Sequence, residues 1–379
     1  HARVYDWNGS AWVQLGSDID GEAAGDESGY SVSMNSSGSR VAISAQKNDG
    51  TATGAGHVRV FDWSGSAWTQ LGSDIDGEAS NDYFGSSVAL NASGDRLVVG
   101  AILNDSGGNN AGYVRVFDWS GSAWVQLGAD IDGESAGDYS GYSVAISASG
   151  DEIVVGAILN DGTGTDAGHV RIFEWNGSVW TQVGSDIDGE DAGDYLGRSV
   201  AMSDDGITVA SGAILNDGGG TSAGHVRAFR FHSPQHNAFV PIGSDITSGY
   251  SNAQLFGESI DLNDSGDLIA IGDSAWDGGD GHVRVYGNNS VTWSQKGTAL
   301  SSISGSNDNL GKEVALDSTG SYLMVTAPNA VHPTKSVWAK EETLVGDHVG
   351  GTFAGRSTLL GITGLDFSES GTRVVIPSS

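Results

Sequence analysis

The chain has no cysteine, little proline and few basic residues, and each shortage excludes a class of protein. Its 379 residues include 5 Pro, 0 Cys, and 17 Lys plus Arg against 48 Asp plus Glu. Without cysteine there are no disulfides, thiolate metal sites or cysteine nucleophiles. The net charge of −31 argues against nucleic acid and anionic membrane surfaces as partners, because both are bound through clustered Lys and Arg. No apolar run approaches the ~20 residues that a membrane-spanning helix needs.

Glycine, by contrast, is abundant, and it recurs at the same position in each unit of a long internal repeat. Residues 62–89 and 118–145 are identical at 21 of 28 positions, and the same unit recurs near residues 6 and 174. One glycine precedes an apolar run in each of seven units, which are 50 to 60 residues apart: Gly29, Gly85, Gly141, Gly197, Gly257, Gly311 and Gly361. A period of this length is typical of repeat architectures.

Each unit predicts four short strands and no helix. In one unit the expected strands are 87–90, 96–101, 113–119 and 124–127, all rich in Val, Ile, Phe or Trp and bounded by Gly, Asn, Asp or Ser. No segment has a sustained helical periodicity. Seven such units predict an all-β protein, a seven-bladed β-propeller of four-stranded antiparallel blades.

The two ends of the chain predict how this ring closes. Residues 1–16 match a third and a fourth strand, whereas 372–376 match a second strand. We therefore expect residues 1–16 to pair with the C-terminal strands and complete the last blade, because closure removes exposed sheet edges. The chain would then be a single propeller, 1–379, with regular repeats in 1–230 and degenerate blades in 231–379. A piece of a longer chain or assembly is the alternative.

Three segments of the unit carry a family resemblance. Residues 82–89 (DYFGSSVA), 97–101 (LVVGA) and 112–117 (GYVRVF) resemble the FG-GAP repeat, which builds the seven-bladed propeller of integrin α-chains and of many surface proteins. The phenylalanine of the motif is kept only at Phe84 and Phe256, while the glycine stays. The resemblance implies an extracellular or cell-surface location and a role in protein–protein interaction or adhesion. The family's calcium turn does not carry over, because the matching turns, such as 91–94 (NASG), lack its aspartate series.

Acidic residues recur instead in the loop that joins the fourth strand of one unit to the first strand of the next. Two interpretations remain open: a calcium site, since calcium takes six to eight oxygen ligands, or a structural turn whose acids accept N–H bonds or pair with arginine. In the family these loops share one face with the loops between second and third strands. The candidate calcium ligands are Asp18, Asp20, Glu22, Asp26, Asp74, Asp76, Glu78, Asp82, Asp130, Asp132, Glu134, Asp138, Asp186, Asp188, Glu190 and Asp194. No cofactor is otherwise required.

Histidine and arginine alternate at the start of the third strands. One histidine per unit cannot converge with the others, so we favour a ring of interblade ion pairs over an anion-binding ladder. The histidines are His57, His169, His225 and His282, and the arginines are Arg3, Arg59, Arg115, Arg171, Arg227 and Arg284.

Tryptophan pairs and glycosylation sequons mark the turns. The pairs predict cross-strand packing in a hairpin, or else exposed rings that contact a partner or a sugar: Trp63 with Trp68, Trp119 with Trp124, and Trp175 with Trp180. Seven N-x-S/T sequons lie in expected surface turns and would accept N-linked glycans in a secreted protein: Asn8, Asn35, Asn91, Asn104, Asn176, Asn263 and Asn288.

Three functional hypotheses follow from these features. The leading one is a non-enzymatic module, extracellular or on the cell surface, that binds a protein partner in adhesion or in the assembly of an extracellular structure. Its unique site is expected in 231–379, where the repeat breaks and Lys296, Lys312, Lys335 and Lys340 occur. The alternative is a multivalent glycan-binding lectin that uses the repeated Trp and acidic loops. An enzyme would require carboxylates that converge at one mouth of the central channel, and the sequence has no G-x-S-x-G, H-E-x-x-H or P-loop motif.

Overall fold

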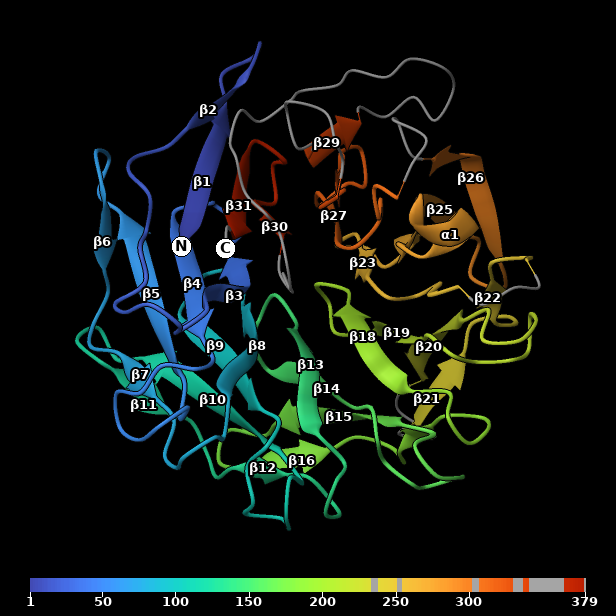
Figure 1. Cartoon of the computed structure of the whole chain (residues 1–379), viewed down its shortest axis with the longest axis horizontal. Helices are drawn as coiled ribbons and strands as arrows, with labels where there is room; N and C mark the ends of the chain where they lie inside the picture. The colour runs from blue at the N-terminus through green and yellow to red at the C-terminus, as the bar shows by residue number, and fades with distance from the viewer. Residues whose placement is uncertain (233–237, 251–253, 302–306, 330–336, 341–364, 378–379) are drawn as a thin grey trace.

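The fold consists of small sheets arranged around a central axis (Figure 1). The structure, a computed structural model, describes residues 1–232, 238–250, 254–301, 307–329, 337–340 and 365–377. The first strands of successive sheets lie nearest the axis, and the two chain ends lie side by side (Figure 1). Apart from one short helix, α1 (Trp276–Gly279), the regular elements of the described part are β-strands.

Four sheets repeat one antiparallel meander, in which each strand pairs with the next one along the chain. The first contains β3 (Ser28–Met34), β4 (Arg40–Ala45), β5 (His57–Trp63) and β6 (Trp68–Gln70). The second contains β8 (Phe84–Leu90), β9 (Arg96–Ala101), β10 (Tyr113–Trp119) and β11 (Trp124–Gln126). The third contains β13 (Ser140–Ile146), β14 (Glu152–Ala157), β15 (His169–Trp175) and β16 (Trp180–Gln182). The fourth contains β18 (Leu196–Met202), β19 (Thr208–Ala213), β20 (His225–His232) and β21 (Ala238–Pro241).

Three further sheets come from the degenerate half and the chain ends. One contains β23 (Ile260–Leu262), β24 (Leu268–Asp273), β25 (His282–Asn288) and β26 (Trp293–Ser301). The next contains β27 (Val314–Leu316), β28 (Leu323–Thr326) and β29 (Val337–Lys340). The last joins β30 (Asp366–Phe367) and β31 (Arg373–Pro377) to β1 (Ala2–Trp7) and β2 (Trp12–Gln14).

The sheets identify a β-propeller with four-stranded antiparallel blades. Six sheets have at least four strands, whereas β27–β29 has three in the part of the chain that the structure describes. The described residues therefore contain six complete blades, where the sequence predicts seven. The marker glycine of the expected seventh unit, Gly361, lies outside those residues.

The predicted pairing of the chain ends is confirmed. β1 pairs with β31 in an antiparallel register that places Ala2 opposite Pro377 and Asp6 opposite Arg373. Residues 1–16 thus supply the third and fourth strands of the sheet that the C-terminal strands begin.

A fifth, two-residue strand in four of the sheets was not predicted. These strands are β7 (Ile75–Asp76), β12 (Ile131–Asp132), β17 (Ile187–Asp188) and β22 (Ile246–Thr247). Each pairs with the beginning of its sheet's third strand, as when Val58 lies opposite Ile75. The isoleucine is buried, so this pairing fixes the acidic loop on the edge of its own sheet.

The hydrophobic core lies between neighbouring sheets. Successive side chains of a strand point to opposite faces, and in β9 both faces are covered. Leu97 packs with Val58 of the preceding sheet, while Val98 packs with Ile153 of the following one, and all four side chains are fully buried. The middle strands are therefore apolar almost throughout, as in 97–101 (LVVGA).

The marker glycines lie in close contact with the neighbouring sheet. Gly141 has a φ of +86°, and a Cβ placed on it would lie 2.7 Å from the carbonyl oxygen of Tyr113. Its own carbonyl accepts a hydrogen bond of 2.7 Å from the Ser87 hydroxyl of the preceding sheet. Equivalent serine–glycine bonds recur at Ser143–Gly197, Ser199–Gly257 and Ser259–Gly311.

Candidate binding face and central channel

Both long loops of each unit lie on one face of the propeller, which we call the loop face. Asn104, in the loop between β9 and β10, donates a 2.9 Å bond to Asp82 in the crossover loop that precedes β8. The amide of Gly133, in the next crossover loop, bonds to the carbonyl of Gly112 over 2.8 Å. The expectation that the two loop types share one face is thus confirmed. The opposite face carries the short turns between first and second strands, and we call it the turn face.

The four acids of each crossover loop have separate partners. The first acid accepts a bond from a glutamine of the fourth strand, as from Gln70 to Asp74 at 2.6 Å. The fourth acid is buried and fastens two loops together, since Asp138 accepts bonds from the Ser135 amide and the Asn160 side chain. The equivalent bonds to Asp26, Asp82 and Asp194 come from Asn48, Asn104 and Asn216.

The second and third acids face the following sheet. The carbonyl of Asp132 accepts a 2.7 Å bond from Arg171, and burial raises the pKa of its carboxyl group. Glu134, the third acid, is about two-fifths exposed and lies near His169 and Arg171. The same arrangement holds for Asp20 with Glu22 and for Asp188 with Glu190. The described residues thus do not bring the four acids of one loop together, and calcium binding by these loops stays a prediction.

Carboxylates from successive loops instead meet at buried histidines. Three groups recur, and in each the candidate ligand atoms lie within 4.8 Å of one another: Glu22, His57 and Asp74; Glu134, His169 and Asp186; Glu190, His225 and Asp245. Burial lowers the pKa of His169 to about 4 and also lowers the pKa values of His57 and His225. These imidazoles are therefore neutral near pH 7.

The third-strand arginines bind loop carbonyls of the preceding sheet, as from Arg171 to Asp132, and acids of the loops at their own sheet. Arg115 forms ion pairs with Glu78 at 2.8 Å and with Asp130 at 2.7 Å. Arg3 makes a bidentate pair with Asp18 at 2.9 and 2.8 Å.

The tryptophan pairs pack against the preceding sheet. The rings of Trp63 and Trp68 are 5.3 Å apart, and the Trp68 indole N–H donates a 2.9 Å bond to the Leu15 carbonyl. The Trp63 ring lies against Gly16, where a Cβ would come within 2.9 Å. Trp124 and Trp180 donate matching bonds to the carbonyls of Leu71 and Leu127. The rings are half-buried, which supports the packing interpretation.

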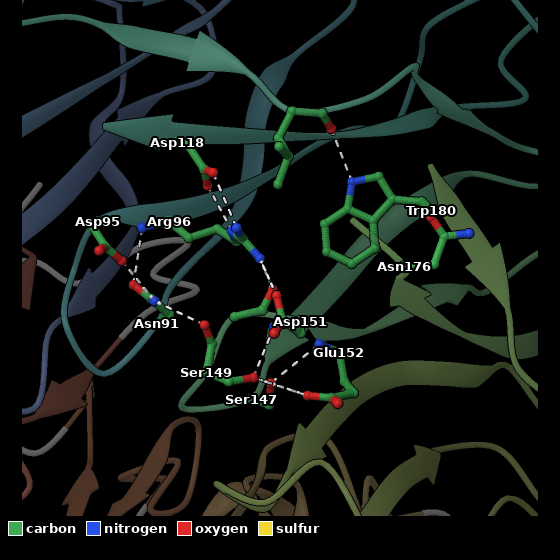
Figure 2. Close-up of polar contacts among 12 residues, drawn as sticks. Asn91, Asp95, Arg96, Asp118, Ser147, Ser149, Asp151, Glu152, Asn176 and Trp180 are labelled. Atoms are coloured by element: carbon green, nitrogen blue, oxygen red, sulfur yellow. Dashed lines mark hydrogen bonds and ion pairs between the residues drawn. The ribbon is translucent and has the colours of Figure 1, made fainter. Parts of the chain in front are cut away.

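On the turn face, arginines of the second strand clamp two sheets together. Arg96 holds Asp118 of its own sheet through two bonds of 2.6 and 3.0 Å. Its remaining guanidinium nitrogen reaches the next sheet, at the Gly150 carbonyl and the Asp151 carboxylate. Figure 2 shows Arg96 between these two carboxylates, beside the turn of Ser147 and Ser149. Arg40 and Arg373 make the same contact at Gly94 and Gly38.

Four of the seven sequon asparagines are not on the surface. Asn35, Asn91, Asn104 and Asn263 are at most 5% exposed, and their side-chain amides are hydrogen-bonded within the turns. The expectation of surface sequons is wrong for these four, because the amide replaces missing backbone partners in each turn. Asn8 and Asn176 are exposed, and Asn288 is half-buried.

The turns of the turn face form a circle around the channel. Each turn donates one backbone N–H to the carbonyl of the turn that follows it around the axis. The circle runs Ser36, Ala92, Ala148, Asp204, Asp264, Ser318, Glu369 and back to Ser36, with N···O distances between 2.8 and 3.3 Å. Inside it lies a cavity of about 280 Å³, lined by first-strand residues of all seven sheets.

Three carboxylates gather at this turn-side mouth of the channel. Asp204, Asp264 and Glu369 come from three different sheets, and their oxygens lie within 4.8 Å of one another. Burial, together with the charges of Asp204 and Glu369, raises the pKa of Asp264 to about 7. These three acids are 60 or more residues apart in the sequence, so no local pattern predicts the cluster.

The loop-side mouth is lined by residues that differ from unit to unit. The position after the marker glycine holds Tyr30, Ser86, Tyr142, Arg198, Glu258 and Lys312 in successive units. The guanidinium of Arg198 lies 5.1 Å from the ring centre of Tyr142. Buried Glu258 accepts a bond from Lys312 and lies 3.5 Å from Arg198. A cavity of about 210 Å³ is lined by Tyr30, Ser86, Tyr142, Arg198 and Glu258, and Lys312 is connected to it through its bond to Glu258.

The two cavities share part of their lining. Val32, Val88, Val144 and Val200 line both of them at the middle of the first strands, and so do Leu365 and the acids Asp261 and Asp366. Lys312 belongs to the mouth, Lys296 lies on β26, and Lys335 is outside the described residues.

The fold and the repeats together define a β-propeller that contains FG-GAP repeats. Residues 74–117 and 130–173 match the family described as the FG-GAP repeat. No curated protein sequence matches the chain.

Solved structures share the fold at low sequence identity. The Kuenenia stuttgartiensis hydrazine synthase is 16% identical, with a TM-score of 0.58, over 96% of this chain and 99% of that one. A putative 6-phosphogluconolactonase from Bacteroides uniformis is 13% identical, with a TM-score of 0.59, over 93% and 96% of the two chains. At such identities the likeness concerns the fold alone. None of the described helices is long and apolar enough to cross a membrane.

Proposed function

We propose that this propeller is a non-enzymatic binding module of an extracellular or cell-surface protein. Its partner is a protein that docks on the loop face, over the loop-side mouth. The observation that carries the proposal is the contrast between this mouth and the rest of the repeat. Contacts between sheets recur almost unchanged, whereas the residue after the marker glycine is of five different types in six successive units.

A unique site on a repetitive protein requires such a contrast. Tyr30, Tyr142 and Arg198 come from regular units, while Glu258 and Lys312 come from degenerate ones. Near-identical units thus contribute different side chains to one place. Tyrosine and arginine are the residue types most often found at energetically important positions of interfaces. FG-GAP propellers often serve in protein interactions, which agrees with this role.

The surrounding charge favours a basic partner. The crossover loops of the same face carry acids such as Glu22, Glu78 and Glu134, whose side chains are two-fifths to two-thirds exposed. The net charge of −31 would accelerate association with a positively charged surface at low ionic strength.

Binding assays with mouth variants test this proposal. Wild type, Tyr142→Ser and Arg198→Ala would be immobilised and exposed to surface proteins of the source organism. We expect one protein to be retained by wild type, with its Kd weakened at least about tenfold by either change. Asp151→Ser on the turn face is the control and should bind as wild type does. Equal affinity of all four proteins for that partner would refute docking at the mouth.

The lectin alternative makes a different prediction. Stepwise loss of glycan binding in Trp63→Ala, Trp119→Ala and Trp175→Ala would favour it. The half-buried rings and their contacts with the preceding sheet offer little free face for a sugar.

An enzymatic role is the second candidate, and one observation favours it. The carboxylates of Asp204, Asp264 and Glu369 converge at one mouth of the channel, which is what catalysis by this chain would require. Turnover of ester, lactone or glycoside substrates by wild type, lost in a folded Asp264→Asn variant, would replace the binding proposal.

We also propose that the seven units close into one seven-bladed ring. Seven turns share an unbroken circle of backbone bonds, and the terminal sheet contacts its neighbour where Asp366 accepts a 2.7 Å bond from the Met34 amide. An experimental density map that shows a fourth strand beside β29 would verify the seventh blade.

A further inference from the structure

Three histidines occupy the same position at the loop face and face carboxylates of two successive crossover loops. His57, His169 and His225 begin the third strands β5, β15 and β20. The glutamate of each group comes from the loop before the sheet, and the aspartate comes from the loop after its fourth strand. Each group therefore links the two ends of one repeat unit.

In two of the three groups, the histidine nitrogen that faces the acids lacks a hydrogen-bond partner. His57 and His169 are each 1% exposed, and their Nδ1 atoms have no hydrogen bond. Nδ1 lies 3.8 Å from a glutamate oxygen in both groups, Glu22 in one and Glu134 in the other. In the third group, His225 Nδ1 lies 3.9 Å from Glu190 and from Asp245. These separations are too long for hydrogen bonds.

The one regular unit that has tyrosine at this position shows what otherwise fills the space. There Arg115 lies between the two acids and contacts Glu78 and Asp130 directly, at 2.8 and 2.7 Å. In the His169 unit the matching Arg171 is 3.6 Å from Glu134 and instead donates to the Asp132 carbonyl. Where histidine is present, the guanidinium stands farther from these acids than in the tyrosine unit: Arg59 lies 4.0 Å from Glu22, Arg171 lies 3.6 Å from Glu134, and Arg227 lies 3.5 Å from Asp245.

We propose that each of the three groups binds a divalent first-row transition cation of the zinc type. The histidine Nδ1, the glutamate and the aspartate supply three ligands, and water supplies the open position through the exposed glutamate side. This site is independent of whichever partner docks at the channel mouth.

The distances and ligand types suit such an ion. Two atoms that each bind zinc at ~2.0–2.2 Å lie at most about 4.4 Å apart. The distances of 3.8 and 3.9 Å between Nδ1 and the glutamate oxygen fall below this limit, and the aspartate oxygen lies within 4.8 Å of both atoms. Imidazole nitrogen is a preferred ligand of zinc and its neighbours in the periodic table, whereas calcium takes six or more oxygens. Two carboxylates and one imidazole therefore favour zinc over calcium.

Zinc stoichiometry tests the proposal on the full chain. Metal-free protein would be dialysed against micromolar ZnCl₂, and bound zinc would be measured by mass spectrometry. Because Tyr113 shows that the fold accepts tyrosine, His169→Tyr should lose one equivalent, and the triple variant with His57→Tyr and His225→Tyr should lose three. Glu134→Gln should also lose one equivalent, while Glu78→Gln in the tyrosine unit should lose none.

Three outcomes would overturn the assignment. They are a stoichiometry that the triple variant leaves unchanged, an equal loss in Glu78→Gln, and binding of calcium in place of zinc. If a tyrosine variant failed to fold, Glu22→Gln, Glu134→Gln and Glu190→Gln would decide the question, because these exposed side chains contribute little to packing.

Discussion

At the scale of single residues, the marker glycine combines a left-handed backbone with a close contact between sheets. Gly141 and Gly137 both have positive φ, at +86° and +91°. A Cβ on Gly141 would meet the Tyr113 carbonyl at 2.7 Å, whereas a Cβ on Gly137 would meet nothing within 4 Å. This difference explains why the glycine of the motif stays while the preceding phenylalanine varies: a buried side chain can be exchanged, but the backbone contact cannot.

Alanine substitutions at Gly137 and Gly141 separate the cost of backbone strain from the cost of steric crowding between sheets. Gly137→Ala should cost about 1–2 kcal/mol for the left-handed conformation alone. Gly141→Ala should cost a further 1–3 kcal/mol, roughly, because the added methyl group overlaps the neighbouring sheet. Urea unfolding of both variants measures the two costs. An equal loss of unfolding free energy in the two variants would show that the neighbouring sheets move apart to admit the methyl group without an energetic cost.

At the scale of elements, polar contacts that recur at fixed positions of the repeat hold the blades together. The ion pair between Arg96 and Asp118 lies on the turn face, and the hydrogen bond from Asn104 to Asp82 lies on the loop face. The two contacts are at opposite ends of the strands. Between them, the apolar middle strands fill the space from sheet to sheet. Each unit thus depends on its neighbours, as expected for repeat proteins.

Removing one of these contacts should lower the free energy of unfolding measurably. Arg96→Ala loses a bidentate ion pair and two contacts with the next sheet, so we expect a loss of about 1–2 kcal/mol in the free energy of unfolding. Asp151→Ser removes only a half-exposed carboxylate and should change it by less than about 0.5 kcal/mol. Denaturant titration compares the two, and a loss below about 0.5 kcal/mol for Arg96→Ala would mean that Arg96 does not couple the sheets.

At the scale of the whole molecule, the propeller brings together residues that no local pattern connects. The acids of the turn-side mouth are 60 or more residues apart in the chain, and the circle of turns brings them together. Because the pKa of Asp264 is raised to about 7 in the fold, its unfolded state ionises at lower pH. Its contribution to stability is therefore complete below about pH 4 and is lost as pH rises towards 7.

Two substitutions in one turn should show opposite pH dependence. Asp264→Asn should raise the midpoint of thermal unfolding relative to wild type at pH 8 and lose this advantage near pH 4. Asp267 has its pKa lowered by hydrogen bonds from Ser265 and Asn263, so Asp267→Asn should destabilise the fold at pH 7 and have little effect near pH 2. If the midpoints of thermal unfolding of both variants changed with pH in the same direction relative to wild type, the opposite pKa shifts assigned to Asp264 and Asp267 would be contradicted.

Much of the architecture could be read from the residues themselves. The expected strands 96–101 and 113–119 match β9 and β10 to the residue, and the pairing of residues 1–16 with the C-terminal strands is confirmed. Strands and turns depend on neighbours within a few residues, so alternation of apolar side chains and the placement of Gly, Asn and Ser determine them. The extra strand β7 escaped prediction because a two-residue pairing has no pattern of its own.

Only the tertiary structure decided which side chains meet. Glu22 lies 35 residues before His57, and Tyr142 lies 56 residues before Arg198, yet each pair is in contact or nearly so. The same arrangement buries Asn91 and Asn104, which look like surface sequons in the sequence. Contacts of this kind depend on how each sheet stacks on the next around the axis. That geometry arises from packing between units, and the repeat period alone does not encode it.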